Sequence, residues 1–243
     1  MYPVLFRIGD FEITSFGVLV GIAALVGIWM FTRELRRSGL PADAADAAVA
    51  GVIGGLIGAK VIWAVEFSGD APLTDLLFSR GGLSWFGGLL GGVGTGLWML
   101  RWRRVPILGA LAAATPALSL GHAIGRIGCF MVGDDYGRPS DLPWAVAFPD
   151  GRPPTTVPVH PTQLYESLAL AVIAWALIGW RRKGVADSVV LGRYFILTGS
   201  TRFAIEFIRI NQRIVGPLTL AQIFALSVVL IGIVLLSRRA RLG

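Results

Sequence analysis

Charged residues are scarce in this chain, and that scarcity is the first guide to its class. Only 15% of the 243 residues are charged, whereas 54% are hydrophobic and the mean hydropathy is +0.69. A soluble domain of this length carries about 25% charged residues to cover its surface. The chain cannot cover itself in water, so we expect lipid to face much of it.

Cysteine, histidine and lysine are also rare. The single cysteine, Cys129, excludes an internal disulfide. The few His and Cys residues show no metal-ligand spacing, and no G-x-x-x-x-G-K-[ST] sequence occurs, so we expect no metal, no cofactor and no ATP chemistry. All but two of the 22 basic residues are Arg, and they cluster between apolar runs. Such clusters indicate topology and lipid headgroups rather than nucleic acid.

Long apolar runs predict an all-α polytopic membrane protein with about seven transmembrane helices. A span needs about 20 apolar residues. A weaker run at about 189–209 contains charged residues, but the basic clusters at 181–183 and 238–241 require an even number of spans between them. The six clear runs lie at roughly 16–33, 47–67, 82–100, 105–125, 162–180 and 216–237. We therefore expect one transmembrane domain over 1–243, without a cleavable signal peptide, because no basic segment precedes the first run.

Basic clusters lie on one side of this arrangement, which predicts an outside N-terminus and a cytoplasmic C-terminus. The longest connection is an outer-face loop at about 126–161, and a loop of this length is usually functional or disordered. Its Trp144 and Phe148 predict contact with the membrane surface. Small residues four apart predict close helix packing. These pairs are Gly17/Gly21, Gly51/Gly55, Gly54/Gly58, Gly87/Gly91 and Gly88/Gly92.

Ionisable residues inside the predicted spans fall at a similar depth, near the outer face. Each one costs at least about 2.5–3.5 kcal/mol on insertion scales, so each needs a partner or a purpose. The spacing places His122 with Arg126, and Arg202 with Glu206 and Arg209, on single helix faces. The full set is Lys60, Glu66, His122, Arg126, His160, Gln163, Glu166, Arg202, Glu206, Arg209 and Gln222.

Several arginines with few acids to neutralise them favour an anionic ligand. A guanidinium binds phosphate oxygens with two parallel hydrogen bonds and does not lose its charge. At the outer face of a membrane, the phosphate is expected to belong to a phospholipid. Taken singly, Arg202 with Glu206 also fits a buried ion pair, His122 a satisfied interfacial polar residue, and Lys60 a side chain that reaches to headgroups.

Several segments, in this order, resemble those of the prolipoprotein diacylglyceryl transferase family. The central ones are 125–130 (GRIGCF), 133–139 (GDDYGRP) and 160–166 (HPTQLYE). The others are 3–9 (PVLFRIG), 58–60 (GAK), 81–89 (GGLSWFGGL) and 202–209 (RFAIEFIR) followed by Gln222. The resemblance covers essentially the whole chain.

The resemblance implies an enzyme of the bacterial plasma (inner) membrane with its active site toward the outer face. Its partners would be phosphatidylglycerol, membrane lipid, and prolipoprotein signal peptides with a lipobox cysteine. The diacylglyceryl group would move to that cysteine thiol, forming a thioether and releasing glycerol phosphate. The enzyme itself then needs no catalytic cysteine, and we interpret Cys129 as a packing residue.

Four residues are the expected catalytic set: Arg126 and Arg202 bind the phosphate, Glu206 orients Arg202 or accepts a proton, and His122 is the preferred base. Gly133 and Gly137 would let the loop backbone approach the headgroup. The expected substrate-binding residues are Lys60, Gly133, Asp134, Gly137, Arg138, His160, Gln163, Tyr165, Glu166 and Arg209.

The chain departs from the family pattern at several positions. The most serious is Phe86, where the family has its usual candidate base, a His. The others are Phe16 for Tyr, Cys129 and Val132 for Asn, and Asp134 for Glu. The alternatives for the base are His122, His160, Asp134 and Glu206. The runner-up function is a non-catalytic paralogue that binds or moves phospholipid, and a purely structural membrane subunit is a third possibility.

Overall fold

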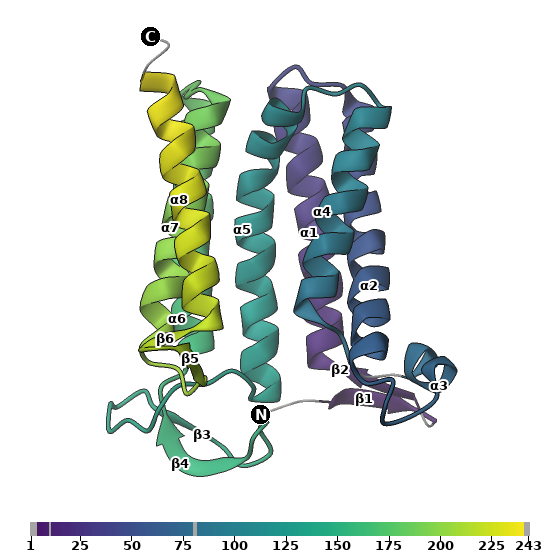
Figure 1. The fold of residues 1–243 in the computed structure, drawn as a ribbon, viewed down its shortest axis with the longest axis vertical. Coiled ribbons are helices and arrows are strands. Elements are labelled where there is room, and N and C mark those ends of the chain that lie inside the picture. The colour runs from purple at the N-terminus through teal and green to yellow at the C-terminus, as the bar shows by residue number, and fades with distance from the viewer. Residues whose placement is uncertain (1–3, 10, 80–81, 241–243) are drawn as a thin grey trace. The chain divides into compact units, whose positions relative to one another are not determined.

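The computed structural model describes residues 4–9, 11–79 and 82–240, and most of them are helical (Figure 1). Seven helices in this part of the chain have 18 or more residues. They are α1 (Ser15–Arg37), α2 (Asp46–Glu66), α4 (Trp85–Trp102), α5 (Ile107–Val132), α6 (Thr162–Arg182), α7 (Asp187–Glu206) and α8 (Leu220–Ala240). Each corresponds to one of the predicted apolar runs.

Five candidate spans among the described residues are long and apolar enough to cross a membrane: α1, α2 with the residues just before it, α5, α6 and α8. The chain is therefore a mostly helical membrane protein, as its composition predicts. A short helix precedes α2 (η1, Ala42–Ala45), and another follows it (α3, Leu73–Phe78). Outside the helices, the described residues form three antiparallel strand pairs: β1 (Val4–Ile8) with β2 (Phe11–Thr14), β3 (Val146–Phe148) with β4 (Thr155–Val159), and β5 (Arg213–Val215) with β6 (Leu218–Thr219).

The chain divides into two compact units, one of residues 28–113 and one of residues 1–27 with 114–243. In the first unit α2 and α4 lie side by side (Figure 1). A Cβ on Gly58 would lie 2.4 Å from the Gly87 carbonyl oxygen, and one on Gly91 would lie 2.2 Å from that of Gly54. Thr95 Oγ1 also donates to the Ala50 carbonyl oxygen at 2.9 Å. The predicted glycine packing is confirmed for the four pairs on these two helices.

The α2–α4 contact gives a stability prediction with a matched control on one helix. In Gly91→Val the added side chain meets the α2 backbone, and overpacking of this kind costs about 1–3 kcal/mol. Gly94→Val adds the same atoms where nothing lies within 4 Å. We expect Gly91→Val alone to lower the thermal midpoint of the detergent-solubilised protein, followed by circular dichroism. Equal midpoints for the two variants would contradict this packing.

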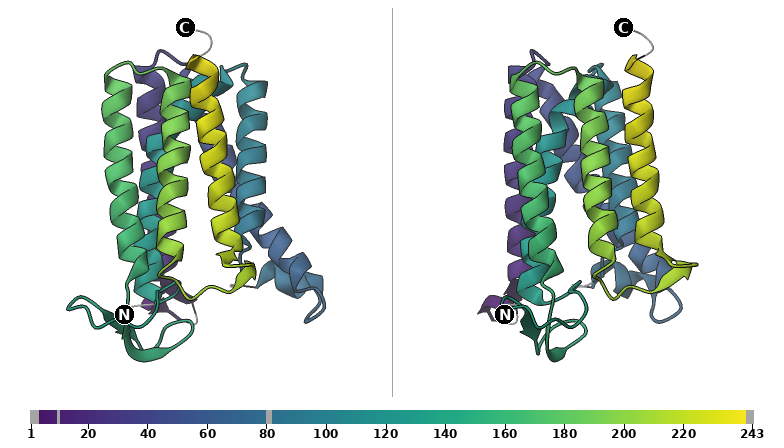
Figure 2. Two further views of the ribbon diagram at one scale, coloured as in Figure 1. Left: turned by 60° about the vertical axis from the view of Figure 1, so that its left-hand side comes forward. Right: turned by 90° about the vertical axis from the view of Figure 1, so that its left-hand side faces the viewer.

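In the second unit, buried hydroxyls and glycines join neighbouring helices. Ser119 Oγ on α5 donates to the Leu170 carbonyl oxygen on α6 at 2.7 Å, and Ser167 Oγ on α6 donates to that of Ala123 on α5 at 2.9 Å. Helices α7 and α8 lie side by side in both views of Figure 2. A Cβ on Gly192 would lie 3.0 Å from the Gly232 carbonyl oxygen.

The first predicted glycine pair does not mediate helix packing. Among the described residues, a Cβ on Gly21 would meet no atom within 4 Å, and one on Gly17 would meet only Thr14 Oγ1, at 3.1 Å. The Gly17 backbone N–H donates to this same oxygen at 3.1 Å. Gly17 therefore belongs to the start of α1, where Thr14 satisfies a free N–H group.

The loop after α5 has a small aromatic core of its own. Tyr136 and Phe148 stack with ring centroids 5.5 Å apart, and Phe130 meets Phe148 edge to face at 5.6 Å. Phe148 is fully buried, so its predicted place on the membrane surface is wrong, whereas Trp144 is exposed. The loop begins after Val132, later than predicted, because α5 extends through Arg126.

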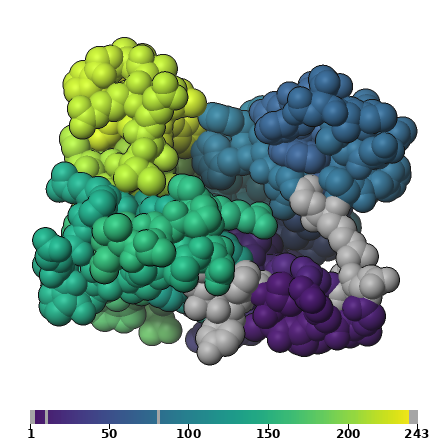
Figure 3. All heavy atoms as spheres, turned by 90° about the horizontal axis from the view of Figure 1, so that it is seen from below, coloured from purple at the N-terminus to yellow at the C-terminus, as the bar shows by residue number. Residues whose placement is uncertain are grey.

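The loop packs against the chain that follows α7. The Arg138 backbone N–H donates to the Ile208 carbonyl oxygen at 2.9 Å, and Gly137 forms a bridge with Arg209. Figure 3 shows the loop in green beside the yellow-green segment after α7. Helix α7 ends at Glu206, so Arg209 lies beyond the helix on which we predicted it. These contacts bring Arg209 toward the end of α5.

Candidate active site

Seven charged or ionisable side chains in the second unit form one continuous chain of contacts. We call this set the ion-pair chain. It runs from α5 to α6 and back to α5. It then passes through the loop to a residue just after α7 and ends on α7. In order, its members are His122, Glu166, Arg126, Asp135, Arg209, Glu206 and Arg202. Six of them were predicted site residues, and Asp135 was not.

His122 and Arg126 do share a face of α5, since both approach one carboxylate. Glu166 Oε1 lies 3.8 Å from His122 Nε2, and Glu166 Oε2 lies 3.0 Å from Arg126 Nε. The Glu166 side chain is only 2% exposed, whereas that of His122 is 48% exposed. Glu166 therefore has little surface for a headgroup. The geometry favours positioning of Arg126 over the direct substrate contact that we predicted.

Glu206 joins two arginines at the other end of the chain. Its Oε2 lies 2.9 Å from Arg202 Nη2 and 3.8 Å from Arg209 Nε. Its Oε1 accepts hydrogen bonds from Asn211 Nδ2 at 2.7 Å and from Thr219 Oγ1 at 2.8 Å. The carboxylate is completely buried. This carboxylate suits the orienting role, because Arg202, Asn211 and Thr219 already contact its two oxygens.

Helix α8 begins beside this carboxylate with a reciprocal capping arrangement. The Gln222 backbone N–H donates to Thr219 Oγ1 at 3.2 Å, and the Thr219 backbone N–H donates to Gln222 Oε1 at 3.1 Å. Gln222 is thus engaged at the helix start, as in a capping box. Its contribution to the site is to hold Thr219, which donates to Glu206.

Asp135 connects the two halves of the ion-pair chain, and the sequence prediction missed it. Its Oδ2 accepts from Arg126 Nη1 at 2.7 Å, and its Oδ1 accepts from Arg209 Nη2. Burial alone would raise the pKa of Asp135, but Arg209 and then Arg126 outweigh it, so the pKa lies below the usual value. The carboxylate therefore stays ionised at neutral pH.

The expectation that few acids neutralise the arginines is wrong. Within the ion-pair chain, the three guanidiniums of Arg126, Arg202 and Arg209 contact three carboxylates. A buried unpaired guanidinium would be costly, and this explains the balance. Three guanidinium nitrogens are buried without a hydrogen-bond partner among the described residues: Arg126 Nε, Arg209 Nε and Arg202 Nη1. The two Nε atoms lie 3.0 Å and 3.8 Å from carboxylate oxygens, whereas the ion pair of Arg202 is made by its Nη2.

The predicted loop glycines have structural explanations. Gly133 has φ +72° directly after α5, a left-handed conformation that suits glycine at a helix end. A Cβ on Gly137 would lie 2.9 Å from His160 Cβ and 2.9 Å from Thr162 Cγ2. The space beside Gly137 is filled by the protein itself. The predicted approach of a headgroup to Gly137 therefore finds no support in this structure.

Asp134 and Gln163 lie together beside the ion-pair chain. Gln163 Nε2 donates to the Asp134 carbonyl oxygen, and Gln163 Oε1 is buried without a hydrogen bond among the described residues. Burial first, and the charge of Asp135 second, raise the pKa of the Asp134 carboxyl. Both side chains therefore keep polar atoms available next to the site.

Three more predicted residues lie where the loop meets α6. His160 Nδ1 lies 3.3 Å from Tyr165 Oη, which accepts from Trp144 Nε1 at 2.7 Å. The His160 backbone N–H donates to the Arg138 carbonyl oxygen at 3.1 Å, and the Arg138 side chain is exposed. These residues fix the loop to α6 and present an aromatic surface.

Lys60 lies on α2, in the other unit. Its Nζ donates to the carbonyl oxygen and to Oγ of Ser79, both at 2.8 Å, and lies 4.6 Å from the Trp63 ring centroid. The ammonium thus holds the chain just after α3. Glu66, at the end of α2, accepts from Ser84 Oγ at 3.3 Å.

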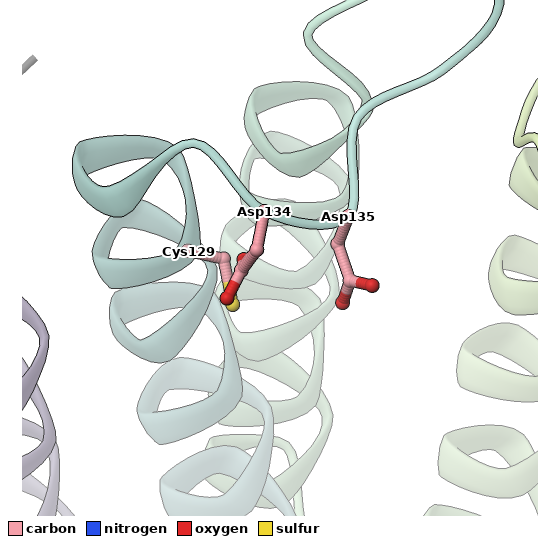
Figure 4. Close-up of side chains that lie close together, drawn as sticks. All are labelled: Cys129, Asp134 and Asp135. Carbon is pink, nitrogen blue, oxygen red and sulfur yellow. The ribbon is translucent and has the colours of Figure 1, made fainter. Parts of the chain in front are cut away.

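Cys129, Asp134 and Asp135 bring three potential metal ligands within 4.8 Å of one another. Figure 4 shows the Asp134 carboxylate beside the Cys129 thiol, with the Asp135 carboxylate directed away from the thiol. Asp135 already accepts from two guanidiniums, so a cation would have to displace both. The two guanidiniums therefore compete with any cation for the Asp135 carboxylate.

Cys129 gives a prediction in which activity is retained. Its sulfur lies 3.8 Å from Arg126 Nη1 and is partly buried, as expected for a small packing residue. The family resemblance implies that the substrate supplies the nucleophile, so Cys129→Ala and Cys129→Asn should keep transfer within about threefold of the parent, less than a typical general-base contribution. A folded but inactive Cys129→Ala, with lipid trapped on Cys129 in the parent by mass spectrometry, would contradict this assignment.

Membrane-length helices and a buried set of guanidinium and carboxylate groups define a helical membrane protein with an internal polar site. A sequence model of the prolipoprotein diacylglyceryl transferases matches residues 3–238. The chain belongs to this family.

Individual relatives are similar along nearly their whole length. The chain is 32% identical over 254 residues to the phosphatidylglycerol–prolipoprotein diacylglyceryl transferase of Geobacter sulfurreducens, covering 98% of this chain and 96% of the relative. It is 31% identical over 250 residues to the enzyme of that name from Vibrio cholerae serotype O1, covering 96% and 90%. For that of Clostridium tetani, the identity is 29% over 238 residues, covering 96% of each.

Proposed function

We propose that this protein transfers the diacylglyceryl group of phosphatidylglycerol to the lipobox cysteine of prolipoproteins. It acts in the bacterial plasma membrane as a single domain of seven spans over 1–243. Its N-terminus is outside and its C-terminus cytoplasmic. The loop at 133–161 and the ion-pair chain then lie toward the outer face, where lipid and prolipoprotein meet.

The observation that carries this proposal is the ion-pair chain in a member of this family. Arg126, Arg202 and Arg209 approach one region from different elements, and carboxylates hold each of them. Arg202 Nη1, which has no hydrogen-bond partner in the described part of the chain, provides a buried donor for one more acceptor oxygen. A phosphate diester supplies such oxygens, and planar guanidiniums suit it.

The reaction forms one S–C bond and breaks one C–O bond. The substrate thiol gives its proton to a base, and its sulfur attacks the glycerol carbon that bears the phosphate. The bonding electrons leave with the phosphate oxygen as glycerol phosphate. Negative charge grows on that phosphate, so Arg126 and Arg202 lower the barrier by binding it.

The carboxylates position these groups, and His122 is our choice for the base. Glu206 orients Arg202, and Glu166 holds Arg126 while approaching His122. The His122 ring is half exposed, so a substrate thiol can reach it. The headgroup is bordered by Arg209, Asp134 and Gln163. The peptide or lipid near the loop contacts Arg138, His160 and Tyr165. Lys60 binds outer headgroups.

Complementation tests this function directly. A strain depleted of its own transferase should grow when it expresses this chain. The purified full chain should move labelled diacylglycerol from phosphatidylglycerol vesicles to a lipobox peptide, but not to one with Ser in place of Cys. A well-expressed chain that binds phosphatidylglycerol and transfers nothing would favour the non-catalytic lipid-binding alternative, which Phe86 in place of the family His supports.

The proposed topology has its own test. A reporter fused to the C-terminus should signal the cytoplasm, and one inserted at 140–156 should signal the outer side. Reversed signals would put the ion-pair chain near the wrong leaflet and would contradict the mechanism.

A further inference from the structure

We propose that the Asp135 carboxylate occupies the anion-binding position between Arg126 and Arg209 in the lipid-free protein, and that the lipid phosphate replaces it there. This inference rests on the function proposed above. Asp135 would thereby set the affinity of the site for its substrate.

The contacts of Asp135 are those of a bound anion. One carboxylate oxygen accepts from Arg126 Nη1 and the other from Arg209 Nη2, so a single anion joins α5 to the chain after α7. Guanidiniums make the same charge-assisted hydrogen bonds to carboxylate and to phosphate. Two oxygens of a phosphate diester would satisfy the same two donors.

Charge balance requires one anion to leave when another enters. The ion-pair chain carries three guanidiniums and three carboxylates. A phosphate diester added to this balanced set leaves one uncompensated negative charge at a partly buried site, which is costly. Moving one carboxylate into water restores the balance.

Only one of the three carboxylates can leave easily. The Glu166 and Glu206 side chains are 2% and 0% exposed, whereas that of Asp135 is 41% exposed. Asp135 also lies on the loop rather than on a helix. Its side chain can turn to solvent without moving a helix.

The backbone at Asp135 favours this exchange. Asp135 has φ +60°, a left-handed conformation that is uncommon for a residue with a side chain. Thr162 Oγ1 donates to its carbonyl oxygen at 2.7 Å and so holds the backbone independently of the carboxylate. Because Arg209 and Arg126 also lower the pKa of Asp135, the carboxylate does not leave by protonation near neutral pH. Another anion must displace it.

The test removes the competing charge and measures binding. Asp135→Asn keeps the shape and suits a left-handed backbone, and Asp135→Gly removes the side chain. Asp141→Asn, an exposed position on the same loop, is the matched control for charge. The two readouts are the KM for phosphatidylglycerol in mixed micelles and the Ki of free glycerol phosphate.

We expect both Asp135 variants to lower the KM and the Ki by roughly tenfold, because a competitor that occupies the site most of the time reduces apparent affinity by the unoccupied fraction. Asp141→Asn should change neither constant. A raised KM in folded Asp135 variants would overturn the proposal and make Asp135 a structural bridge. A change in Ki alone would also overturn it, because the site would then bind the free phosphate and not the lipid.

Failure of the proposed function has a different signature. If the parent transfers lipid and the Asp135 variants bind phosphatidylglycerol no more tightly, the proposed displacement of Asp135 is wrong but the proposed transferase function stands. The other outcome is that the parent shows no transfer while Asp135→Asn binds glycerol phosphate more tightly by calorimetry. In that case the anion site stands and the transferase function is wrong.

Discussion

Arg126→Lys should lower the transfer rate by about 10²–10³-fold, the usual cost of losing one donor to a developing anion. Arg126 uses its planar group in two directions, with Nε near Glu166 and Nη1 bonded to Asp135. A lysine keeps the charge but offers one ammonium, which cannot hold both carboxylates and a phosphate. Arg202→Lys should have a similar effect, because it would remove Nη1, the buried donor that we propose binds a phosphate oxygen.

The measurement is transfer from phosphatidylglycerol to a lipobox peptide by purified, membrane-inserted variants. Arg152→Lys is the matched control, since Arg152 is exposed on the loop that carries Asp135. Its backbone N–H donates to the Gly133 carbonyl oxygen, and the substitution leaves that hydrogen bond in place. It should transfer at the parental rate. Near-normal rates for both Arg126→Lys and Arg202→Lys would remove these residues from phosphate binding.

The helices could be predicted because hydropathy reports burial in lipid directly. Each of the seven predicted runs coincides with a helix of at least 18 residues in the described part of the chain. The ends of the helices were harder to predict from the sequence. Helix α5 continues past Arg126 to Val132 because tertiary ion pairs compensate the charge, whereas the hydropathy of that segment suggests an exit.

The residues of the site on helices could also be predicted, since spacing defines a helix face. His122 and Arg126 meet Glu166 as their positions suggest. Asp135 could not be found this way, because residue spacing in an irregular loop does not show which way a side chain points. Its role depends on the left-handed turn at Gly133 and on pairing of Gly137 with Arg209. Phe148 was misplaced for the same reason: an aromatic in a loop can face lipid or its own loop core.

Phe86 stands where the family resemblance implies a His as the candidate base, and the structure shows what contacts each alternative base. Glu206 is occupied by Asn211, Thr219 and Arg202. His160 lies beside Tyr165, which fixes the loop. Asp134 has a raised pKa and stays a candidate. His122, at the α5 end of the ion-pair chain, has a side chain that is 48% exposed and lies 3.8 Å from Glu166 Oε1.

His122→Phe should therefore lower the transfer rate by about 10²–10⁴-fold, the range of a general-base contribution, while phosphatidylglycerol binding is largely retained. Histidine is the side chain that most often serves as a general base. Rates should be measured across about pH 6 to 9, so that a change in the shape of the pH profile is detected as well as a change in rate. Phe86→His should be tolerated in the parent and should partly rescue His122→Phe, since it restores the base position of the family. Parental rates for His122→Phe over this whole range would make His122 a structural partner of Glu166, and the proton would then pass to Asp134 or to water near the arginines.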